Sequence, residues 1–267
     1  MFTRTLLISL IMTAHSLSAI AATNMTGRQI YEKVNARFDG EQVTRNFTLK
    51  LTDRRNVTRV QKTQGFRKYF GDERRIVLFY TEPNNVRGTG FMTYDYAEAS
   101  KDDDQWLYLP ALRKVRRISA SDRGDYFLGT DLTYEEIRKE GKVEIEDYTY
   151  EVLGEAEVDG FNTLKVQSTP INDVIAKEIG YSKVISFIDP KIWMSRKAEY
   201  WDVNGNRLKT IENRDIQQID KIWTTTKITV NNHKTEHRTE ITFYDIDYGT
   251  PVADKIFTQQ ALKRGLR

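Results

Sequence analysis

Two histidines, His233 and His237, stand four residues apart in the sequence. On a helix this spacing places both side chains on one face, where they suit a metal ion. Here they flank the run Val230-Asn231-Asn232-His233-Lys234, whose polar residues are typical of a β-hairpin turn. The helical spacing has no meaning in a hairpin, so we expect an exposed turn and no metal site.

Other residues that carry chemistry form no catalytic pattern. The acids at Asp102 to Asp104 and in "DLTYEE", from Asp131, lack EF-hand spacing. The sequence has no cysteine, no nucleophile elbow, no phosphate-binding glycine loop and no HExxH motif. We therefore expect a protein that is not an enzyme and that uses no cofactor.

The first 21 residues have the pattern of a secretory signal peptide. Arg4 precedes an apolar run from Leu6 to Met12, which is too short to span a bilayer, and Ala19-Ile20-Ala21 fits a cleavage site. We expect export, a periplasmic location in a Gram-negative host, and one domain over residues 22–267. Because the sequence has no cysteine, we expect no lipid anchor. The near balance of 41 Lys and Arg against 38 Asp and Glu argues against nucleic acid as a partner.

Periodicity predicts one N-terminal helix followed by many strands. Thr26 caps a helix that carries Ile30, Val34 and Phe38 on one face. Apolar residues alternate from Val43 to Leu51, with Arg45 as the exception. The remaining predicted elements are a strand in 56–71, a strand at 76–80 buried on both faces, a hairpin of 88–96 with 105–109, a short helical segment in 132–139, and strands at 143–153, 162–168, 183–188, 196–203, 207–213, 221–230 and 238–248.

Short turns between successive strands imply antiparallel pairing. The fold class that follows is α+β: a strongly curved antiparallel sheet of about ten strands, an open half-barrel with a few helices covering its concave face. So few helices cannot fill so large a sheet, and we expect an apolar cavity that holds lipid. Its predicted lining consists of Val34, Phe38, Phe47, Leu49, Leu78, Phe91, Trp106, Tyr108, Phe127, Ile185 and Phe187.

A basic run follows the strand that contains Trp106 and Tyr108. Strand parity puts these two aromatic residues on one face and Leu107 and Leu109 on the other, and we assign the aromatic face to the cavity. Pro110 then ends the strand. The cations Arg113, Lys114, Arg116, Arg117 and Arg123 are expected at the cavity mouth, where they bind a phosphate head group. The alternatives are a solvated loop or a patch that docks an acidic partner.

The central block "DDDQWLYLPALRKVRRISASDRGDYFLGTDLTYEEI" resembles the bacterial outer-membrane lipoprotein-sorting family, a LolA-like group. The stretches "GYSKVISFIDP", "EYWDVNGNRLK" and "IFTQQALKRG" agree with it, so the resemblance spans nearly all of the chain after residue 21. It implies a LolA/LolB/RseB-type fold, an incomplete antiparallel barrel with a helical lid over a hydrophobic cavity. LolA itself latches its lid with an arginine, but the resemblance assigns that role to no residue of this chain.

The resemblance implies a periplasmic, monomeric carrier that holds the acyl chains of a lipid or lipoprotein. Members of this group are often associated with RND-type exporters, so an inner-membrane transporter of that type is the implied partner. The alternative is an RseB-like sensor or adaptor, which shares the sheet but binds a membrane protein partner instead of shuttling lipid.

Overall fold

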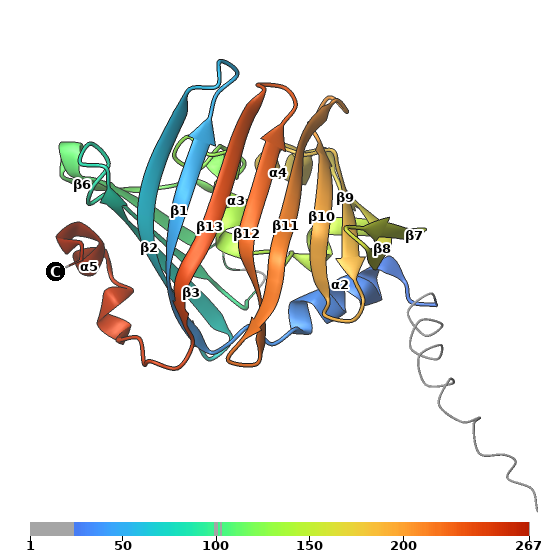
Figure 1. The fold of residues 1–267 in the computed structure, drawn as a ribbon, viewed down its shortest axis with the longest axis horizontal. Helices are drawn as coiled ribbons and strands as arrows, with labels where there is room; N and C mark the ends of the chain where they lie inside the picture. Colours follow the sequence, from blue (N-terminus) through green and yellow to red (C-terminus); the bar gives the residue numbers. More distant parts are fainter. Residues whose placement is uncertain (1–23, 99–100, 102, 267) are drawn as a thin grey trace, which may run out of the picture.

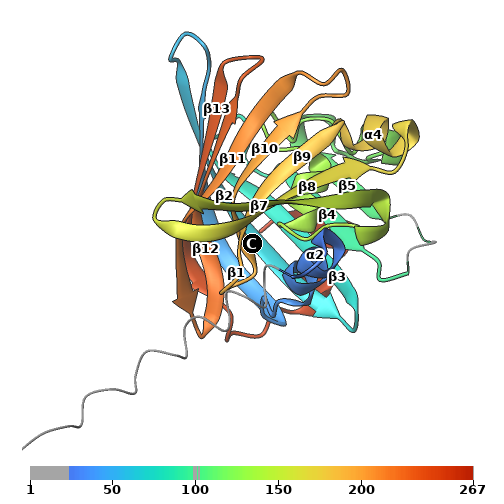
Figure 2. The same ribbon diagram turned by 90° about the vertical axis from the view of Figure 1, so that its right-hand side faces the viewer.

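The protein is built around one strongly curved sheet of thirteen strands that does not close into a barrel (Figures 1 and 2). The structure is a computed structural model and describes residues 24–98, 101 and 103–266. The strand order is β6-β5-β4-β3-β2-β1-β13-β12-β11-β10-β9-β8-β7, and every neighbouring pair is antiparallel. The predicted α+β class with an open curved sheet is confirmed, with thirteen strands in place of about ten.

The pairing of β1 with β13 joins two meanders in the middle of the sheet. The edges are therefore β6, at the end of the first meander, and β7, at the start of the second. The strands are β1 (Gln42–Thr52), β2 (Thr58–Phe70), β3 (Glu73–Glu82), β4 (Gly90–Asp95), β5 (Asp104–Leu109), β6 (Lys114–Arg117), β7 (Tyr148–Val158), β8 (Phe161–Pro170), β9 (Lys183–Asp189), β10 (Met194–Trp201), β11 (Arg207–Ile219), β12 (Ile222–Asn232) and β13 (His237–Asp247).

Four α-helices occur in the described residues: α2 (Gly27–Ala36), α3 (Tyr134–Lys139), α4 (Asp173–Ile179) and α5 (Gln259–Arg264). Thr26 caps α2 with a capping box, as its sequence predicts, and Ile30 and Val34 pack against β8 and β9. Short 3-10 turns occur at Pro110–Leu112, Ala120–Asp122, Ile145–Asp147 and Asp254–Ile256. None of the described helices is long and apolar enough to cross a membrane.

The strand β3 is buried on both faces, as the sequence predicts, because different segments cover each face. Ile76 and Leu78 belong to the core under α3, while Val77 and Phe79 pack against α5 and the segment before it. Seen in Figure 1, α5 lies at the β6 end of the sheet. The outer face of β3 to β5 is thus covered by the C-terminal residues of the chain.

Three elements of the structure were not predicted from the sequence, and the start of one was misplaced. The unpredicted elements are β6, α4 and α5, and the strand predicted from residue 143 starts later, because a 3-10 turn at Ile145–Asp147 precedes β7 at Tyr148. The predicted signal peptide lies outside the described residues.

Candidate functional site

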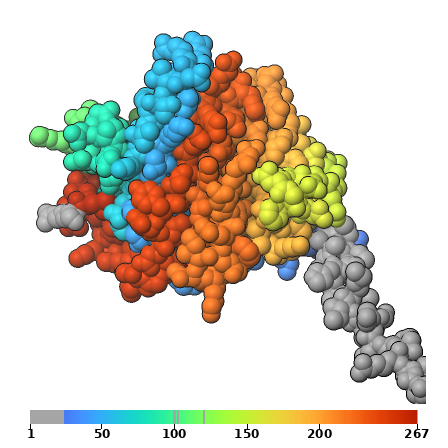
Figure 3. Space-filling model, viewed as in Figure 1, coloured from blue at the N-terminus to red at the C-terminus, as the bar shows by residue number. Residues whose placement is uncertain are grey.

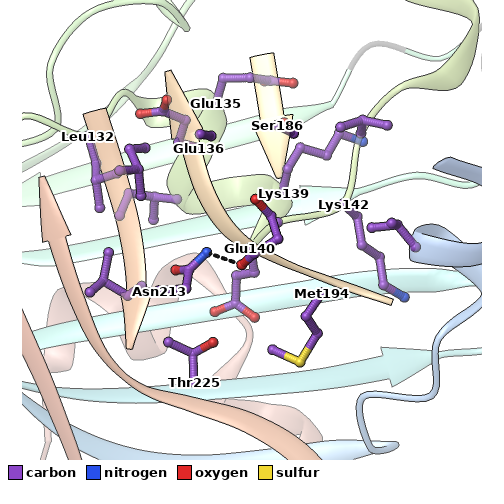
Figure 4. Close-up of a pocket in the computed structure, with 18 of the residues that line it drawn as sticks. Leu132, Glu135, Glu136, Lys139, Glu140, Lys142, Ser186, Met194, Asn213 and Thr225 are labelled. Atoms are coloured by element: carbon purple, nitrogen blue, oxygen red, sulfur yellow. Dashed lines mark hydrogen bonds between the residues drawn. The ribbon is translucent and has the colours of Figure 1, made fainter. Parts of the chain in front are cut away.

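A cavity of about 310 Å³ lies between the concave face of the sheet and α3. Its volume is at the lower end of the ~300–1,000 Å³ that ligand pockets usually have. Strands from both meanders and the helices α2 and α3 contribute to the wall, and Figure 4 shows Leu132, Met194 and Asn213 around the same space as Glu140. The apolar part of the wall includes Phe47, Leu49, Leu78, Phe127, Leu132, Ile211, Ile228, Ile241 and Phe243.

The helix α3 covers this cavity and is tied to the sheet by buried polar contacts. Thr133 and Glu136 form a capping box at its N-terminus. The ammonium of Lys209 on β11 donates to Glu136 Oε2 at 2.7 Å and to the carbonyl of Asp131 at 2.7 Å. From β3, Arg74 Nη2 donates to the carbonyls of Arg138 and Lys139 at the other end of the helix. Both ends of α3 are thus fixed to strands.

A group of charged residues closes one end of the cavity. Arg45 on β1 pairs with Glu140, the residue that ends α3, and its guanidinium lies 4.8 Å from the ring centroid of Phe243. Arg67 on β2 pairs with Asp39 and Glu140, and Lys142 pairs with Asp39. Burial acts to raise the pKa of Asp39, but the charges of Arg67 and Lys142 outweigh it and hold that pKa below its ordinary value.

Three carboxylates beside the cavity, on Asp95, Asp103 and Glu144, lie within 4.8 Å of one another, a spacing that suits a metal ion. Two cations occupy the space between them: Arg138 Nη1 is 2.5 Å from Asp95 and also binds Asp103, and Lys139 binds Asp95 at 2.9 Å and Glu144 as well. Each of the three acids is thus paired with a cation, and Arg74 also pairs with Asp95 at 2.8 Å, so we read the cluster as an ion-pair network.

His233 lies in the predicted turn between β12 and β13, whereas His237 is the first residue of β13, and the two side chains use different partners. His233 Nε2 lies 2.8 Å from Thr210 Oγ1, and His237 Nδ1 lies 2.6 Å from the buried carboxylate of Asp131. A second depression of about 560 Å³ surrounds them at the hairpin tips, but polar side chains line it and no cluster of metal-ligand type includes a histidine in the described residues.

Five of the eleven residues predicted to line the cavity do so: Val34, Phe47, Leu49, Leu78 and Phe127. Phe91 belongs to the same apolar core but lies behind the wall, in contact with Phe127. Phe38 follows the end of α2 and is 62% exposed, so the predicted stripe is correct for Ile30 and Val34 alone. On β9 the facing is reversed: Val184, Ser186 and Ile188 line the cavity, and Ile185 and Phe187 are on the other face.

The predicted facing of Trp106 and Tyr108 is also wrong. Both pack on the outer face with α5, where Trp106 meets the ring of Tyr94 at 4.9 Å between centroids. Leu107, between them, belongs to the core on the concave side. Strand parity correctly separated the two faces of β5. Both faces are covered by other parts of the chain, so the presence of large aromatic residues did not indicate which face is concave.

The predicted basic rim is not at the cavity. Arg113, Lys114, Arg116 and Arg117 lie on and beside the edge strand β6, and none of them lines the cavity. The exposed Arg117 pairs with Asp104 at 2.6 Å and Arg116 approaches Asp122 at 3.9 Å. Arg123 pairs with Glu178 of α4 at 2.5 Å, so in this structure it connects α4 to the segment that precedes α3.

Comparisons with known proteins agree with this architecture. A family model with the description "-like: Uncharacterized protein" matches residues 71–264. A solved domain from Vibrio parahaemolyticus, named for outer membrane lipoprotein sorting, is 26% identical, with a TM-score of 0.80 over 89% of this chain and 98% of that one. The chain belongs to the LolA-like family.

Two further solved structures share the LolA-like fold. A DUF1329 family protein from Desulfovibrio piger has a TM-score of 0.80 at 24% identity, covering 88% of this chain and 97% of its own. A LolA superfamily protein from Nitrosomonas europaea has a TM-score of 0.66 at 22% identity, covering 89% and 99%. No curated protein matches the sequence.

The sequence analysis of this LolA-like chain missed the charged group at the cavity end, although one signal was present. Arg45 was the exception in the alternation of β1, a cation at a position where its neighbours Val43 and Phe47 face inward. A charged residue at a buried position is usually paired or functional. Arg67, whose side chain is 3% exposed, had no such signal, because the residues on its own face of β2, Thr63 and Gly65, form no apolar alternation.

Proposed function

We propose that this protein is a non-enzymatic periplasmic carrier that holds the acyl chain of a lipid or lipoprotein in the cavity under α3. The observation that carries the proposal is the apolar wall of that cavity, which is built from facing strands and closed by one helix. The relative named for lipoprotein sorting supports the same role. The predicted signal peptide supports the periplasmic location.

The energetics of such a site require no catalytic residue. Each buried methylene contributes ~0.8 kcal/mol, so about ten methylenes give ~8 kcal/mol. This is comparable to the ~4–15 kcal/mol that association costs in lost motion. An acyl chain of ordinary length is therefore the kind of ligand that such a cavity retains.

The test is organic extraction of protein purified from the periplasm, followed by mass spectrometry. We expect an acyl lipid at near-stoichiometric amount in the wild type. In Ile228→Trp the added ring occupies the cavity, so the lipid should be reduced several-fold. Thr242→Trp, exposed on the other face of the adjacent strand, is the matched control and should retain it. Wild-type protein without lipid, or equal lipid in both variants, would contradict the proposal.

A second candidate is an RseB-like adaptor, favoured by the edge strand β6. Its cations Lys114, Arg116 and Arg117 lie on an unpaired sheet edge, which suits an extended acidic segment of a partner.

The partner that we propose, for a carrier or an adaptor, is an inner-membrane RND-type exporter. Reversal of Arg116 and Arg117 to Glu should abolish copurification with that exporter and leave bound lipid unchanged. Lipid-free protein that copurifies with it would favour the adaptor.

A further inference from the structure

Two neighbouring strands, β1 and β2, carry cations at one end of the face that lines the cavity. On β1, Leu49 and Phe47 are followed on the same face by Arg45. Gly65 of β2 pairs with Arg45, and Arg67 comes next on that face. The cavity therefore has an apolar body and a basic end, the arrangement that an amphiphile requires.

Arg67 is the most buried cation of this end, with a side chain that is 3% exposed. Its Nη2 donates to the carbonyl of Asp39. Its Nε lies 3.5 Å from Glu140 and its Nη1 lies 2.8 Å from Asp39 Oδ2, but neither N–H points at an acceptor, and both atoms have no hydrogen-bond partner among the described residues. A buried guanidinium with unused donors is costly unless a ligand satisfies it.

Cations exceed acids at this end of the cavity. Arg37, Arg45, Arg67 and Lys142 line it, whereas Asp39 and Glu140 are the acids among them, so four positive charges face two negative ones. The guanidinium of Arg37 donates to the backbone carbonyl of Trp223 at 3.2 Å, which neutralises no charge.

Three glutamates elsewhere in the wall are each paired with a different cation. Glu135, Glu136 and Glu144 are held by Arg138, Lys209 and Lys139, respectively. Asp147 is the remaining acid of the wall, and burial raises its pKa. Burial first and the charge of the neighbouring Arg67 second lower the pKa of Arg45 to about 10.

We propose that this basic end binds the anionic head group, a carboxylate or a phosphate, of an amphiphile whose acyl chain fills the apolar body of the cavity. The inference rests on the proposed function and deepens it by naming the ligand class. The unused N–H groups of Arg67 would donate to the anion, and Arg37, Arg45 and Lys142 would balance its charge. The partial exposure of Arg45 and Lys142, 18% and 19%, leaves this end within reach of water.

The test compares ligands of one chain length and different head groups. Dodecanoate, dodecyl phosphate and dodecanol are titrated into delipidated, full mature protein at low salt and pH 8 by calorimetry. We expect the two anions to bind about tenfold or more tightly than the alcohol, since charged hydrogen bonds are at stake. A larger gain for one anion identifies the head group.

Variants assign the effect to this site. Arg37→Gln and Lys142→Gln should each reduce the preference for anions several-fold while dodecanol binds as before, and Arg67→Lys should reduce it with the charge retained. Arg59→Gln, exposed on the same strand as Arg67, is the control and should keep the wild-type preference. Equal affinity of anions and alcohol in the wild type, or an unchanged preference in all three variants, would overturn this inference and leave the proposed function standing. If no amphiphile binds, the proposed function fails with it.

Discussion

Lys209 on β11 and Glu136 on α3 form an ion pair, with 2.7 Å between Nζ and Oε2, and the Lys209 side chain is fully buried. Glu136 also accepts from the hydroxyl of Tyr181 and from the backbone N–H of Thr133. One carboxylate thus connects the start of α3 to β11 and to the segment between α4 and β9. Burial lowers the pKa of Lys209, and the charge of Glu136 opposes that shift. The carboxylate therefore offsets part of the cost of burying the ammonium.

Removal of this ammonium should destabilise the fold strongly. Lys209→Met leaves Glu136 buried without its cation, and we expect a loss of about 3–5 kcal/mol in the free energy of unfolding. Urea unfolding followed by circular dichroism measures it. The double variant Lys209→Met with Glu136→Gln, which keeps the capping box, should recover part of the loss. Additive losses in the double variant would show that the two residues are not coupled.

The contact of Arg45 with Glu140 should control the mobility of α3. Arg45→Gln removes a charged hydrogen bond between β1 and the end of the helix, so the opening of α3 should become easier by about 1–3 kcal/mol. Hydrogen exchange of the amides of residues 134–140 measures this opening. Lys50→Gln, on the same strand as Arg45, breaks the pair of Lys50 with Glu240 of β13 and is the control. Equal exchange rates in the two variants would show that Arg45 does not restrain the opening of α3.

Trp106 should matter for stability and not for lipid. Trp106→Ala removes a ring from the cluster that holds α5 to the outer face, and since this ring is partly exposed we expect a loss of about 2 kcal/mol. Binding of a fluorescent fatty acid, measured where the variant is folded, should be unchanged. Weaker fatty-acid binding at unchanged stability would indicate that Trp106 lines the cavity, and would contradict its position on the outer face.

Acid should destabilise the protein. The pKa values of Asp39, Asp95 and Glu135 are raised by burial but lowered more by neighbouring cations, so all three lie below the ordinary values of 3.8 and 4.5. Their stabilising contribution is present above those ordinary values and is lost as pH falls through the lowered ones. Asp103 and Asp147 have raised pKa values and act in the opposite direction, but they are fewer.

We therefore expect the urea midpoint to fall between pH 5 and pH 3. Asp39→Asn should reduce this pH dependence, because the variant no longer has one of the paired carboxylates. A midpoint that is the same at both pH values, or a variant with the wild-type slope, would contradict the assignment.

The sequence predicted the fold class because its signals were local. Alternation marked β1, and hydrophobicity over five successive residues marked β3 as buried on both faces. The edge strand β6 was missed because three of its four residues are cations and a single neighbour suffices to pair it. The facing of Trp106 depends on the C-terminal segment, with Phe257 and Leu262, folding back over the outer face, a long-range contact that strand parity does not contain.

The candidate site was predicted only in part, because only its apolar residues have a local signal in the sequence. Phe47, Leu49 and Leu78 were placed in the cavity wall because inward positions of a curved sheet are apolar. The basic end was not found, because it is assembled from Arg37, Arg67 and Lys142, which are far apart in sequence and carry charge where surface residues also do. Only the three-dimensional arrangement shows that these cations share one space.

The central claim is that an acyl chain lies in the cavity under α3, and photolabelling tests it most directly. The protein is loaded with a fatty acid that carries a diazirine in its chain, irradiated and digested, and the labelled peptides are sequenced by mass spectrometry. The account predicts labels on the inward residues of β1, β12 and β13, such as Leu49, Ile228 and Ile241, and their loss in Ile228→Trp. Labels on the outer face around α5 and Trp106, or labels that Ile228→Trp leaves unchanged, would contradict it.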